Sequence, residues 1–600
     1  MGEKNFENPD KITDLKYGFD AFKNGKALFN KKKRLPTMGW NSWNAFGSGN
    51  TEALTKAMCE KIVELGLDKI GYKYVVLDDG CYNAKRVDGH LESDPVKFPS
   101  GFQGMSDFVH SKRLKFGMYN DIGSKLCSGL EVGTCGYEET DAKDYIKWDI
   151  DYIKVDNCYN VWDNATFSNP ENARFTFAPN IRSIRINKTN DSGKSVFQIN
   201  LSAVEDGEIT GNRAFIERDY VTGIGTFDGT GPDSTPLGEL SSELVFNVNV
   251  PEDGEYDLYV TYATGSFEGA GAWLQVTVGE NGEYYYDDFL SVTENQDSFK
   301  ESPSIKISLK AGENRLRLMN HRRQENTLLS YAKIKENFEK INPDKDIVFS
   351  ICEWGKTQPQ NWGYKVGDSW RILNDITFQV GSDGDSGHAS WEGAYTTSVT
   401  AQYNKAVIMD SFSGPGKGYN DPDMLMIGMD GLNETMCKTH MTMWCMMNSP
   451  LMLGMDLRNV KKDDFICSVI SNEDVIALDQ DPLGIQAKRI YTTKAVSPDT
   501  TYLRDNDRID VLCKPLADGS IALSFINVSL GDRKDSVYIG TDLIKHYMSE
   551  KMADPDRFFN ADKFEITDLW TKEKKISEEK GFSCNELKAC DNLTIRIKPL

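Results

Sequence analysis

The residues best suited to chemistry in this chain are carboxylates at the ends of short apolar runs. Residues 152–158 are the clearest case, because a β-branched run there includes Lys154 and Asp156 and ends in polar residues. This pattern is typical of a buried strand that delivers polar side chains at its carboxyl tip. Residues two apart on a strand share one face, so the Lys154 ammonium is expected to keep the Asp156 carboxylate ionised. The run predicts either a reactive site or a structural ion pair.

Other runs also end in acids. The carboxylates at these tips are Asp78, Asp79, Asp121, Asp156, Glu353, Asp375, Asp421 and Asp423. Such a cluster either holds Mg²⁺ or Ca²⁺, or divides into a catalytic pair and hydroxyl-binding groups, as hydrolysis of a glycoside requires. Aromatic residues at the same tips favour the glycoside, because their apolar faces suit sugar rings; they are Trp40, Trp43, Tyr119, Trp354 and Trp370. The metal alternative stays open, although no histidine stands among these tips.

The elements that must position these residues alternate between strands and helices. Eight strand-like runs end near residues 43, 79, 121, 158, 354, 375, 424 and 456. Helical spacing separates them, as in Leu54, Met58 and Ile62, where Asn50 or Thr51 could cap the helix. Neither a dinucleotide fingerprint nor a P-loop follows any strand. The alternation predicts a (β/α)8 barrel with its site at the carboxyl ends of the strands.

Length and periodicity predict further domains. A chain of 600 residues exceeds what one core normally organises. Period-two runs between turn residues fill the middle and the end of the chain, which is typical of antiparallel β-sandwiches. We expect barrel segments at 1–165 and 326–489, an inserted β-sandwich at 166–325 and a C-terminal β-sandwich at 490–600.

Composition limits the partners. A formal charge of −22 opposes binding to nucleic acid or to an anionic membrane. No apolar run approaches the roughly 20 residues that span a bilayer. The charged start resembles no secretion signal, which favours a cytoplasmic protein, with secretion the alternative if a signal has been removed. Twelve cysteines without CxxC pairs argue against a structural zinc site and a dense disulfide framework.

Several of these runs together resemble the family 27 glycoside hydrolases, which comprise α-galactosidases and α-N-acetylgalactosaminidases. The matching segments are residues 38–43, 77–79, 115–119, 154–158, 352–355, 370–375 and 420–425, in the family's order. The resemblance implies a retaining mechanism on a (β/α)8 barrel, with a carbohydrate bearing terminal α-galactose as substrate. It also implies that catalysis needs no metal and no organic cofactor.

The same resemblance assigns the catalytic pair, with Asp156 as nucleophile and Asp375 as acid/base. Asp375 must be protonated to release the leaving alcohol, and the charge of Asp156 would favour that form. Once the sugar is attached to Asp156 this charge is gone, so Asp375 can then act as a base on water. Retention predicts carboxyl groups about 5–5.5 Å apart.

Substrate contacts are implied in the same way. Asp78 and Asp79 would accept the 4- and 6-hydroxyls, and Trp43 would line the apolar side of the ring. The other implied contacts are Tyr119, Cys127, Lys154, Cys158, Glu353, Trp354, Arg371 and Met424. Asp421 and Asp423 are expected to brace loops. The N-acetylgalactosaminidases carry small residues at position 353, so Glu353 and the bulky Trp354 favour a free 2-hydroxyl.

Cysteines and the insertion add two expectations. Cys127 and Cys158 match a half-cystine pair beside the family's active site, and a closed disulfide would count against a reducing cytoplasm. The insertion, with residues 221–230 and 312–318, resembles carbohydrate-binding β-sandwich modules, some of which hold structural calcium. Oligomerisation, a spacer role or shaping of the substrate entrance are alternatives for it.

Our hypothesis from the sequence is a retaining exo-α-galactosidase that acts on oligosaccharides or glycoconjugates. The alternatives are an α-N-acetylgalactosaminidase, a β-L-arabinopyranosidase or a non-catalytic sugar-binding protein on the same scaffold.

Overall fold

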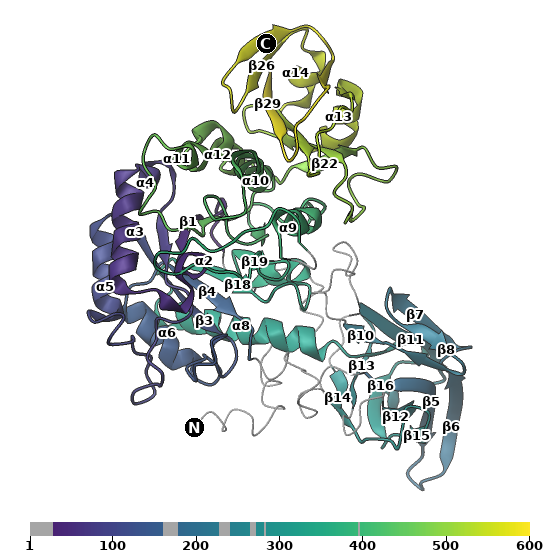
Figure 1. Ribbon diagram of the computed structural model, residues 1–600. Helices are drawn as coiled ribbons and strands as arrows, with labels where there is room; N and C mark the ends of the chain where they lie inside the picture. Colours follow the sequence, from purple (N-terminus) through teal and green to yellow (C-terminus); the bar gives the residue numbers. More distant parts are fainter. Residues whose placement is uncertain are drawn as a thin grey trace.

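The computed structural model describes residues 28–29, 31–159, 178–226, 241–264, 272–280, 284–393 and 397–600. Its secondary structure forms a barrel, an inserted pair of antiparallel sheets and a C-terminal domain (Figure 1). None of the helices in these residues combines the length and the apolar character needed to cross a bilayer.

Eight parallel strands form the barrel, as the alternation predicts. They are β1 (Met38–Asn41), β2 (Tyr74–Val76), β3 (Lys115–Asp121), β4 (Tyr152–Asp156), β18 (Val348–Cys352), β19 (Ser369–Arg371), β20 (Tyr419–Asp421) and β21 (Leu451–Leu453). Their order is β20-β19-β18-β4-β3-β2-β1-β21. Just after β20, Leu425 forms a parallel bridge with Leu453, and its N–H donates to the Met452 carbonyl at 2.8 Å. This bridge joins the two ends of the sheet, so the predicted barrel fold is confirmed.

Helices surround the sheet. They are α2 (Ser42–Phe46), α3 (Glu52–Glu64), α4 (Leu67–Ile70), α5 (Gly101–Ser111), α6 (Glu138–Lys147), α8 (Arg322–Ile341), α9 (Val399–Ala406), α10 (Glu434–Met446), α11 (Phe465–Ile470) and α12 (Glu473–Asp479). Four of them, α2, α3, α9 and α10, begin at a side-chain cap. The Thr51 side chain accepts the Leu54 N–H and caps α3, as expected. Leu54, Met58 and Ile62 bury one face of α3, and each such side chain contributes about 1.5–3 kcal/mol.

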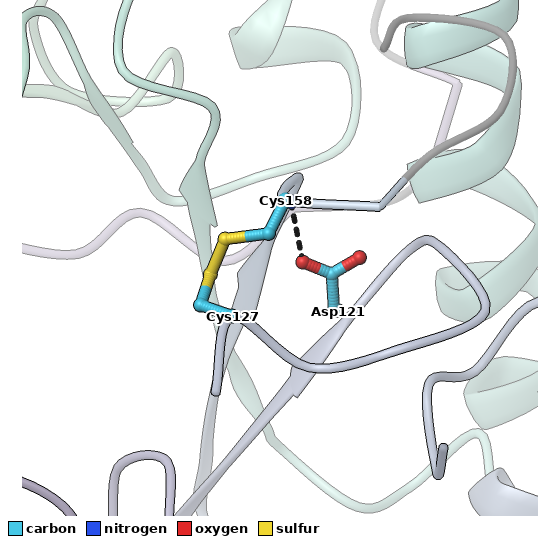
Figure 2. Close-up of side chains that lie close together, drawn as sticks. All are labelled: Asp121, Cys127 and Cys158. Atoms are coloured by element: carbon cyan, nitrogen blue, oxygen red, sulfur yellow. Dashed lines mark hydrogen bonds between the residues drawn. A yellow bond between two sulfur atoms is a disulfide. The ribbon is translucent and has the colours of Figure 1, made fainter. Parts of the chain in front are cut away.

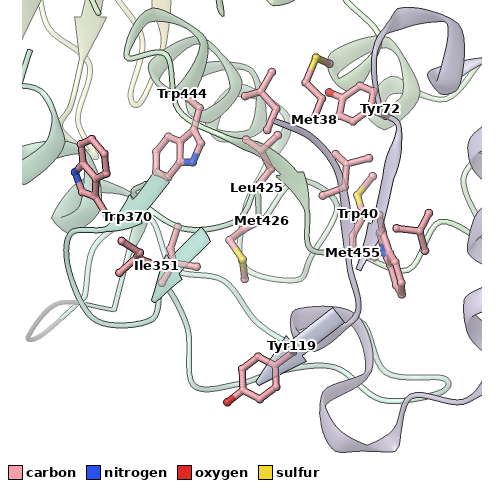
Figure 3. Close-up of a cluster of buried hydrophobic side chains, with 14 of the residues drawn as sticks. Met38, Trp40, Tyr72, Tyr119, Ile351, Trp370, Leu425, Met426, Trp444 and Met455 are labelled. Carbon is pink, nitrogen blue, oxygen red and sulfur yellow. The ribbon is translucent and has the colours of Figure 1, made fainter. Parts of the chain in front are cut away.

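Large aromatic residues fill the barrel core (Figure 3), and two of its buried indole N–H groups are hydrogen-bonded to backbone carbonyls. The indole N–H of Trp40 donates to the Met455 carbonyl at 2.8 Å, and that of Trp444 to the Asp423 carbonyl at 2.7 Å. These bonds avoid the cost of a buried unpaired donor. The Trp40 bond also ties the core to the segment after β21, and the Trp444 bond ties it to the segment after β20.

The insertion consists of two antiparallel sheets around one apolar core. Its strands are β5 (Asn180–Thr189), β6 (Ser195–Ser202), β7 (Gly207–Gly211), β8 (Phe215–Glu217), β9 (Tyr220–Thr222), β10 (Gly225–Thr226), β11 (Ser241–Val250), β12 (Gly254–Ala263), β13 (Ala272–Val278), β14 (Tyr284–Leu290), β15 (Lys300–Glu301), β16 (Ile305–Leu309) and β17 (Gly312–Met319). The boundary expected at 325 falls inside α8, because β17 already ends at Met319. The boundary expected at 165 lies outside the described residues. The same holds for residues 227–230 of the segment that resembles carbohydrate-binding modules.

The C-terminal domain contains helices that the sequence interpretation missed. Its strands are β22 (Lys488–Thr492), β23 (Ile509–Pro515), β24 (Ile521–Asn527), β25 (Val537–Gly540), β26 (Phe564–Asp568), β27 (Lys574–Ser577), β28 (Gly581–Cys584) and β29 (Asn592–Pro599). They form a six-stranded and a two-stranded antiparallel sheet. Between β25 and β26 lie α13 (Thr541–Met548), which buries Ile544 and Met548, and α14 (Pro555–Asn560), which Asp554 caps.

A buried ion cluster joins this domain to the barrel. Asp510 on β23 contacts Arg508 at 3.0 Å and Arg489 at 3.3 Å, and all three side chains are fully buried. From α9 of the barrel, the Tyr403 hydroxyl donates to the same carboxylate at 3.1 Å. Burial opposes ionisation, but the two guanidinium groups outweigh it and hold the pKa of Asp510 below its ordinary value.

Replacing this carboxylate leaves two buried cations without compensation. We expect Asp510→Ala to lower the free energy of unfolding by about 3–5 kcal/mol in urea denaturation. The exposed pair Asp518–Arg596 in the same domain is the control. Asp518→Ala should cost no more than about 1 kcal/mol, and equal losses for the two variants would contradict the prediction.

Candidate active site

A cavity of about 130 Å³ opens at the carboxyl ends of the barrel strands. Its lining comprises Trp43, Asn44, Asp78, Asp79, Tyr119, Cys127, Lys154, Asp156, Cys158, Trp354, Arg371, Asp375, Asp423 and Met424. Every predicted site residue except Glu353 is among them. The sequence interpretation did not place Asn44 in the site, and for Asp423 it favoured a bracing role over substrate contact. Residues far apart in the chain therefore meet at one cavity because they end neighbouring parallel strands.

The two predicted catalytic carboxylates face this cavity from different environments. Asp156 ends β4 and is buried, whereas the Asp375 side chain follows β19 and is 33% exposed. Asp375 is near enough to act electrostatically on Asp156. One carboxylate is thus shielded from water and the other can exchange protons with it.

Lys154 does not pair with Asp156 in the way the strand pattern suggested. Its ammonium contacts the Asp78 carboxylate at 2.9 Å and lies 5.3 Å from the centre of the Tyr119 ring. Burial raises the pKa of Asp156 to about 8; the charge of Lys154 acts in the opposite direction but does not outweigh burial. The charge of Lys154 thus favours ionised Asp156, as expected, but it does not outweigh burial, because the long side chain bonds to Asp78 instead.

Asp78 and Asp79 are held by different partners. Asp78 accepts from the Asn41 amide at 2.7 Å, in addition to Lys154. Asp79 accepts from the backbone N–H of Ser128 at 2.7 Å and from its hydroxyl at 2.8 Å. Burial raises the pKa of Asp79, and the Ser128 bonds counteract it. Sequence reasoning missed Ser128, because nothing in a loop serine signals contact with a carboxylate 49 positions earlier.

A disulfide between Cys127 and Cys158 closes the edge of the cavity between β3 and β4 (Figure 2). The Cys158 N–H donates to the Asp121 carboxylate at 2.6 Å, and the Gly123 N–H donates to its other oxygen at 2.6 Å. Burial raises the pKa of Asp121 to about 7 despite these donors. Because both sulfurs are bonded to each other, neither offers a thiolate to a metal. The closed disulfide also counts against the expected reducing compartment.

Arg371 connects the acid/base candidate to its brace. One of its nitrogens contacts both Asp375 and Asp423 at 2.9 Å. Asp423 also accepts the N–H groups of Ile376 and Met424 at 2.8 Å. These bonds agree with the expected bracing role of Asp423, although its side chain also faces the cavity.

Glu353 does not reach the cavity, in contrast to its expected role as a sugar contact. It is fully buried, and one oxygen accepts from the N–H and the hydroxyl of Thr357 at 2.9 and 2.7 Å. Its neighbour Trp354 turns toward the cavity with a φ of 56°. A left-handed backbone at a tryptophan is uncommon, so the change of chain direction here could not be predicted from the residue types.

The remaining lining groups suit a ring with one apolar and one polar side. Trp43 and Met424 pack in one hydrophobic cluster at the cavity. The buried Tyr119 hydroxyl has no hydrogen-bond partner among the described residues. A ligand hydroxyl could satisfy it.

A family described as "Alpha galactosidase A" has a sequence model that matches residues 35–180 and 319–481, more than half of the chain. The chain belongs to this family. The two matched segments are the barrel halves, and the gap between them corresponds to the inserted strands. The family expectation drawn from the motifs is confirmed.

Individual relatives agree. An Alpha-galactosidase A from Cellvibrio japonicus is 24% identical over 92% of this chain and 89% of its own length. An alpha-galactosidase from Oryza sativa subsp. japonica is 24% identical over 82% of this chain and 73% of its own length. The solved structure of a Saccharomyces cerevisiae alpha-galactosidase with raffinose shares the fold, with a TM-score of 0.58 and 19% identity over 94% of this chain and 98% of that one.

The raised pKa of Asp156 predicts how stability depends on pH. The native state keeps a proton up to about pH 8, whereas the unfolded chain releases it near pH 4. Stability of the native protein should therefore fall as pH rises through this window and level off above it. Because Asn cannot ionise, Asp156→Asn should remove the part of this decline that Asp156 causes, leaving the smaller part due to Asp121, and be more stable than wild type at pH 8 by about 2–4 kcal/mol in urea denaturation. Parallel stability curves for the two proteins between pH 4 and 8 would contradict it.

Proposed function

We propose that this protein is a retaining exo-α-galactosidase that releases terminal α-linked galactose from oligosaccharides or glycoconjugates by double displacement. The observation that carries the proposal is the meeting of Asp156 and Asp375 at one sugar-sized cavity, in a chain of the alpha galactosidase A family. The named relatives, all alpha-galactosidases, support it.

Asp156 and Asp375 divide the reaction between them. Ionised Asp156 attacks the anomeric carbon and forms a glycosyl ester, while Asp375 gives its proton to the departing glycosidic oxygen. Asp375 then removes a proton from water, which attacks the same carbon and restores the Asp156 carboxylate. Lys154, together with hydroxyl donors that the sugar brings, favours the ionised form of Asp156 that attack requires.

Galactose recognition is proposed to depend on two pairs of side chains, one polar and one apolar, on opposite sides of the sugar ring. Asp78 and Asp79 are proposed to accept the 4- and 6-hydroxyls, and Trp43 and Met424 to cover the apolar face. Tyr119 supplies a hydroxyl donor that the protein leaves unused among its described residues. A sugar with a misplaced hydroxyl would leave one of these buried groups unpaired, which favours galactose over glucose.

The alternative substrates differ at two positions of the sugar. Because Glu353 does not face the cavity, exclusion of a 2-acetamido group depends on the Trp354 ring instead. A β-L-arabinopyranoside lacks only the 6-carbon and remains an alternative substrate. A panel of nitrophenyl glycosides of α-galactose, N-acetyl-α-galactosamine and β-L-arabinopyranose decides among them, and a rate for the second above the first would reject the proposal. A catalytically silent sugar-binding protein would hydrolyse none of the three.

Removing either carboxylate separates their roles. Asp156→Asn should lower turnover of nitrophenyl α-galactoside by roughly a thousandfold or more, with its fold kept by circular dichroism. Asp375→Asn should slow an oligosaccharide by about 10²–10⁴-fold, but the nitrophenyl substrate less, because nitrophenolate leaves without a proton. NMR of the first-formed sugar should show the α-anomer. Near-wild-type rates for Asp156→Asn, or release of the β-anomer, would contradict the mechanism.

Ser128 offers a milder test of how Asp79 is held. Ser128→Ala removes the hydroxyl bond and keeps the backbone one, so Asp79 should lose part of its orientation. We expect KM for the α-galactoside to rise about three- to tenfold with kcat nearly unchanged. Ser520→Ala in the C-terminal domain is the control, because the Ser520 hydroxyl likewise donates to an aspartate, Asp518. The same KM change in both variants would contradict the inference that Ser128 orients Asp79 for substrate binding.

A further inference from the structure

The inserted sandwich contacts the first turn of α8, the helix that leads back into the barrel (Figure 1). Gln275 of β13 makes the contact and is fully buried. Its side-chain oxygen accepts the backbone N–H of His321 at 2.7 Å, just before α8 begins. Its amide donates to the Glu325 carboxylate at 2.9 Å, one turn later. One side chain of the insertion thus fixes both the start and the first turn of the helix.

The next contact leads from α8 to the active-site wall. The amide of Gln324, which is 1% exposed, donates to the Thr357 carbonyl at 2.8 Å. Thr357 is fully buried and donates its own N–H and hydroxyl to Glu353. Two sets of buried hydrogen bonds, joined by the α8 backbone between Gln324 and Glu325, therefore link the insertion to the segment that carries Trp354. Buried networks of this kind are rigid because each broken bond leaves a costly unpaired group.

This segment needs support, because its backbone is strained. Trp354 and Gln358 have φ values of 56° and 59°, in the left-handed region that bulky residues avoid. Such residues each cost about 1–3 kcal/mol and persist only where their surroundings fix them. Gly355 between them has a φ of 79° and leaves no room for a side chain, since a Cβ there would lie 2.2 Å from the Ile372 carbonyl oxygen. Trp362 provides a second donor to the Thr357 carbonyl, at 3.1 Å.

We propose that the inserted β-sandwich positions the Trp354 wall of the sugar cavity, with Gln275 and Gln324 as positioning residues. The insertion is then part of the substrate site, acting through α8, and not an independent module. The identity of the sugar in this inference rests on the proposed function, but the mechanical link to residues 353–358 does not.

Hydrogen exchange tests the link without any sugar. Gln324→Met keeps the side-chain volume and removes the donor to Thr357. Exchange of the Thr357 amide, followed in a peptide spanning residues 348–362, should speed up about three- to tenfold in the full-length protein. Gln486→Met is the matched control, because Gln486 is also 1% exposed and its amide donates to a backbone carbonyl, that of Ala406, at 2.7 Å. Equal exchange in wild type and Gln324→Met would overturn the link.

Kinetics test its consequence for the substrate. Gln324→Met should raise KM for nitrophenyl α-galactoside about three- to tenfold with kcat within about twofold, while Gln486→Met leaves KM unchanged. A purely structural role would lower the active fraction, and hence kcat, in both variants without moving KM. Gln324→Asn, whose shorter amide keeps a donor, should recover part of the lost affinity.

A double-mutant cycle connects the two glutamines. Gln275→Met should raise KM in the same direction, and the double variant Gln275→Met/Gln324→Met should be no worse than the poorer single variant, because both act along one route. Additive KM changes would show separate routes and overturn the proposal. If the wild-type protein hydrolyses no α-galactoside while exchange at Thr357 responds as expected, the proposed function fails and the link stands. Activity with neither response leaves the function intact and rejects the link.

Discussion

The active-site cavity contains more buried carboxylates than cations, and its chemistry depends on this imbalance. Lys154 and Arg371 face a cavity that also receives Asp78, Asp79, Asp156, Asp375 and Asp423. Each cation is committed to other carboxylates, Lys154 to Asp78 and Arg371 to Asp375 and Asp423. Asp156 has no cation of its own within bonding distance among the described residues, so burial dominates and raises its pKa. An excess of buried acceptors repels anions and suits a neutral ligand rich in hydroxyl donors.

The same imbalance separates the two carboxylates of the proposed reaction. Asp156 lies at the end of β4, paired in register with Asp121 on one side and Cys352 on the other, and it is buried at a cavity that the disulfide also lines. Asp375 lies beyond the end of its strand, partly exposed and oriented by Arg371. A nucleophile gains from a fixed, dry position, whereas a group that must pass a proton to water needs access to it. The barrel provides both because one residue is on the strand and the other is on the loop that follows.

The sequence predicts the scaffold better than the contacts within it. Each barrel strand is a short apolar run that ends in polar residues, so order and number follow from local pattern and from the rule that barrel sites lie at the carboxyl ends. The partner of Lys154 could not be predicted in this way, because its reach to Asp78 depends on how far β4 lies from β2 in the closed sheet. The roles of Ser128 and Glu353 could not be predicted for a related reason. The first gains its role from a loop that folds back on Asp79, and the second loses its expected role because the backbone reverses at Trp354.

The position of the insertion limits what it can do. The chain leaves the barrel after β4 and returns through α8 to β18, and these two strands pair along their whole length, Tyr152 with Val348 through Asp156 with Cys352. Whatever is inserted between them is therefore tethered beside the nucleophile strand. A domain attached by a loose linker would move independently of the site. This one is attached through a 20-residue helix whose first turn is bonded to the insertion by Gln275 and to the cavity wall by Gln324. A displacement of the sandwich must then shift α8 or break buried hydrogen bonds, so the insertion and the sugar cavity behave as one mechanical unit.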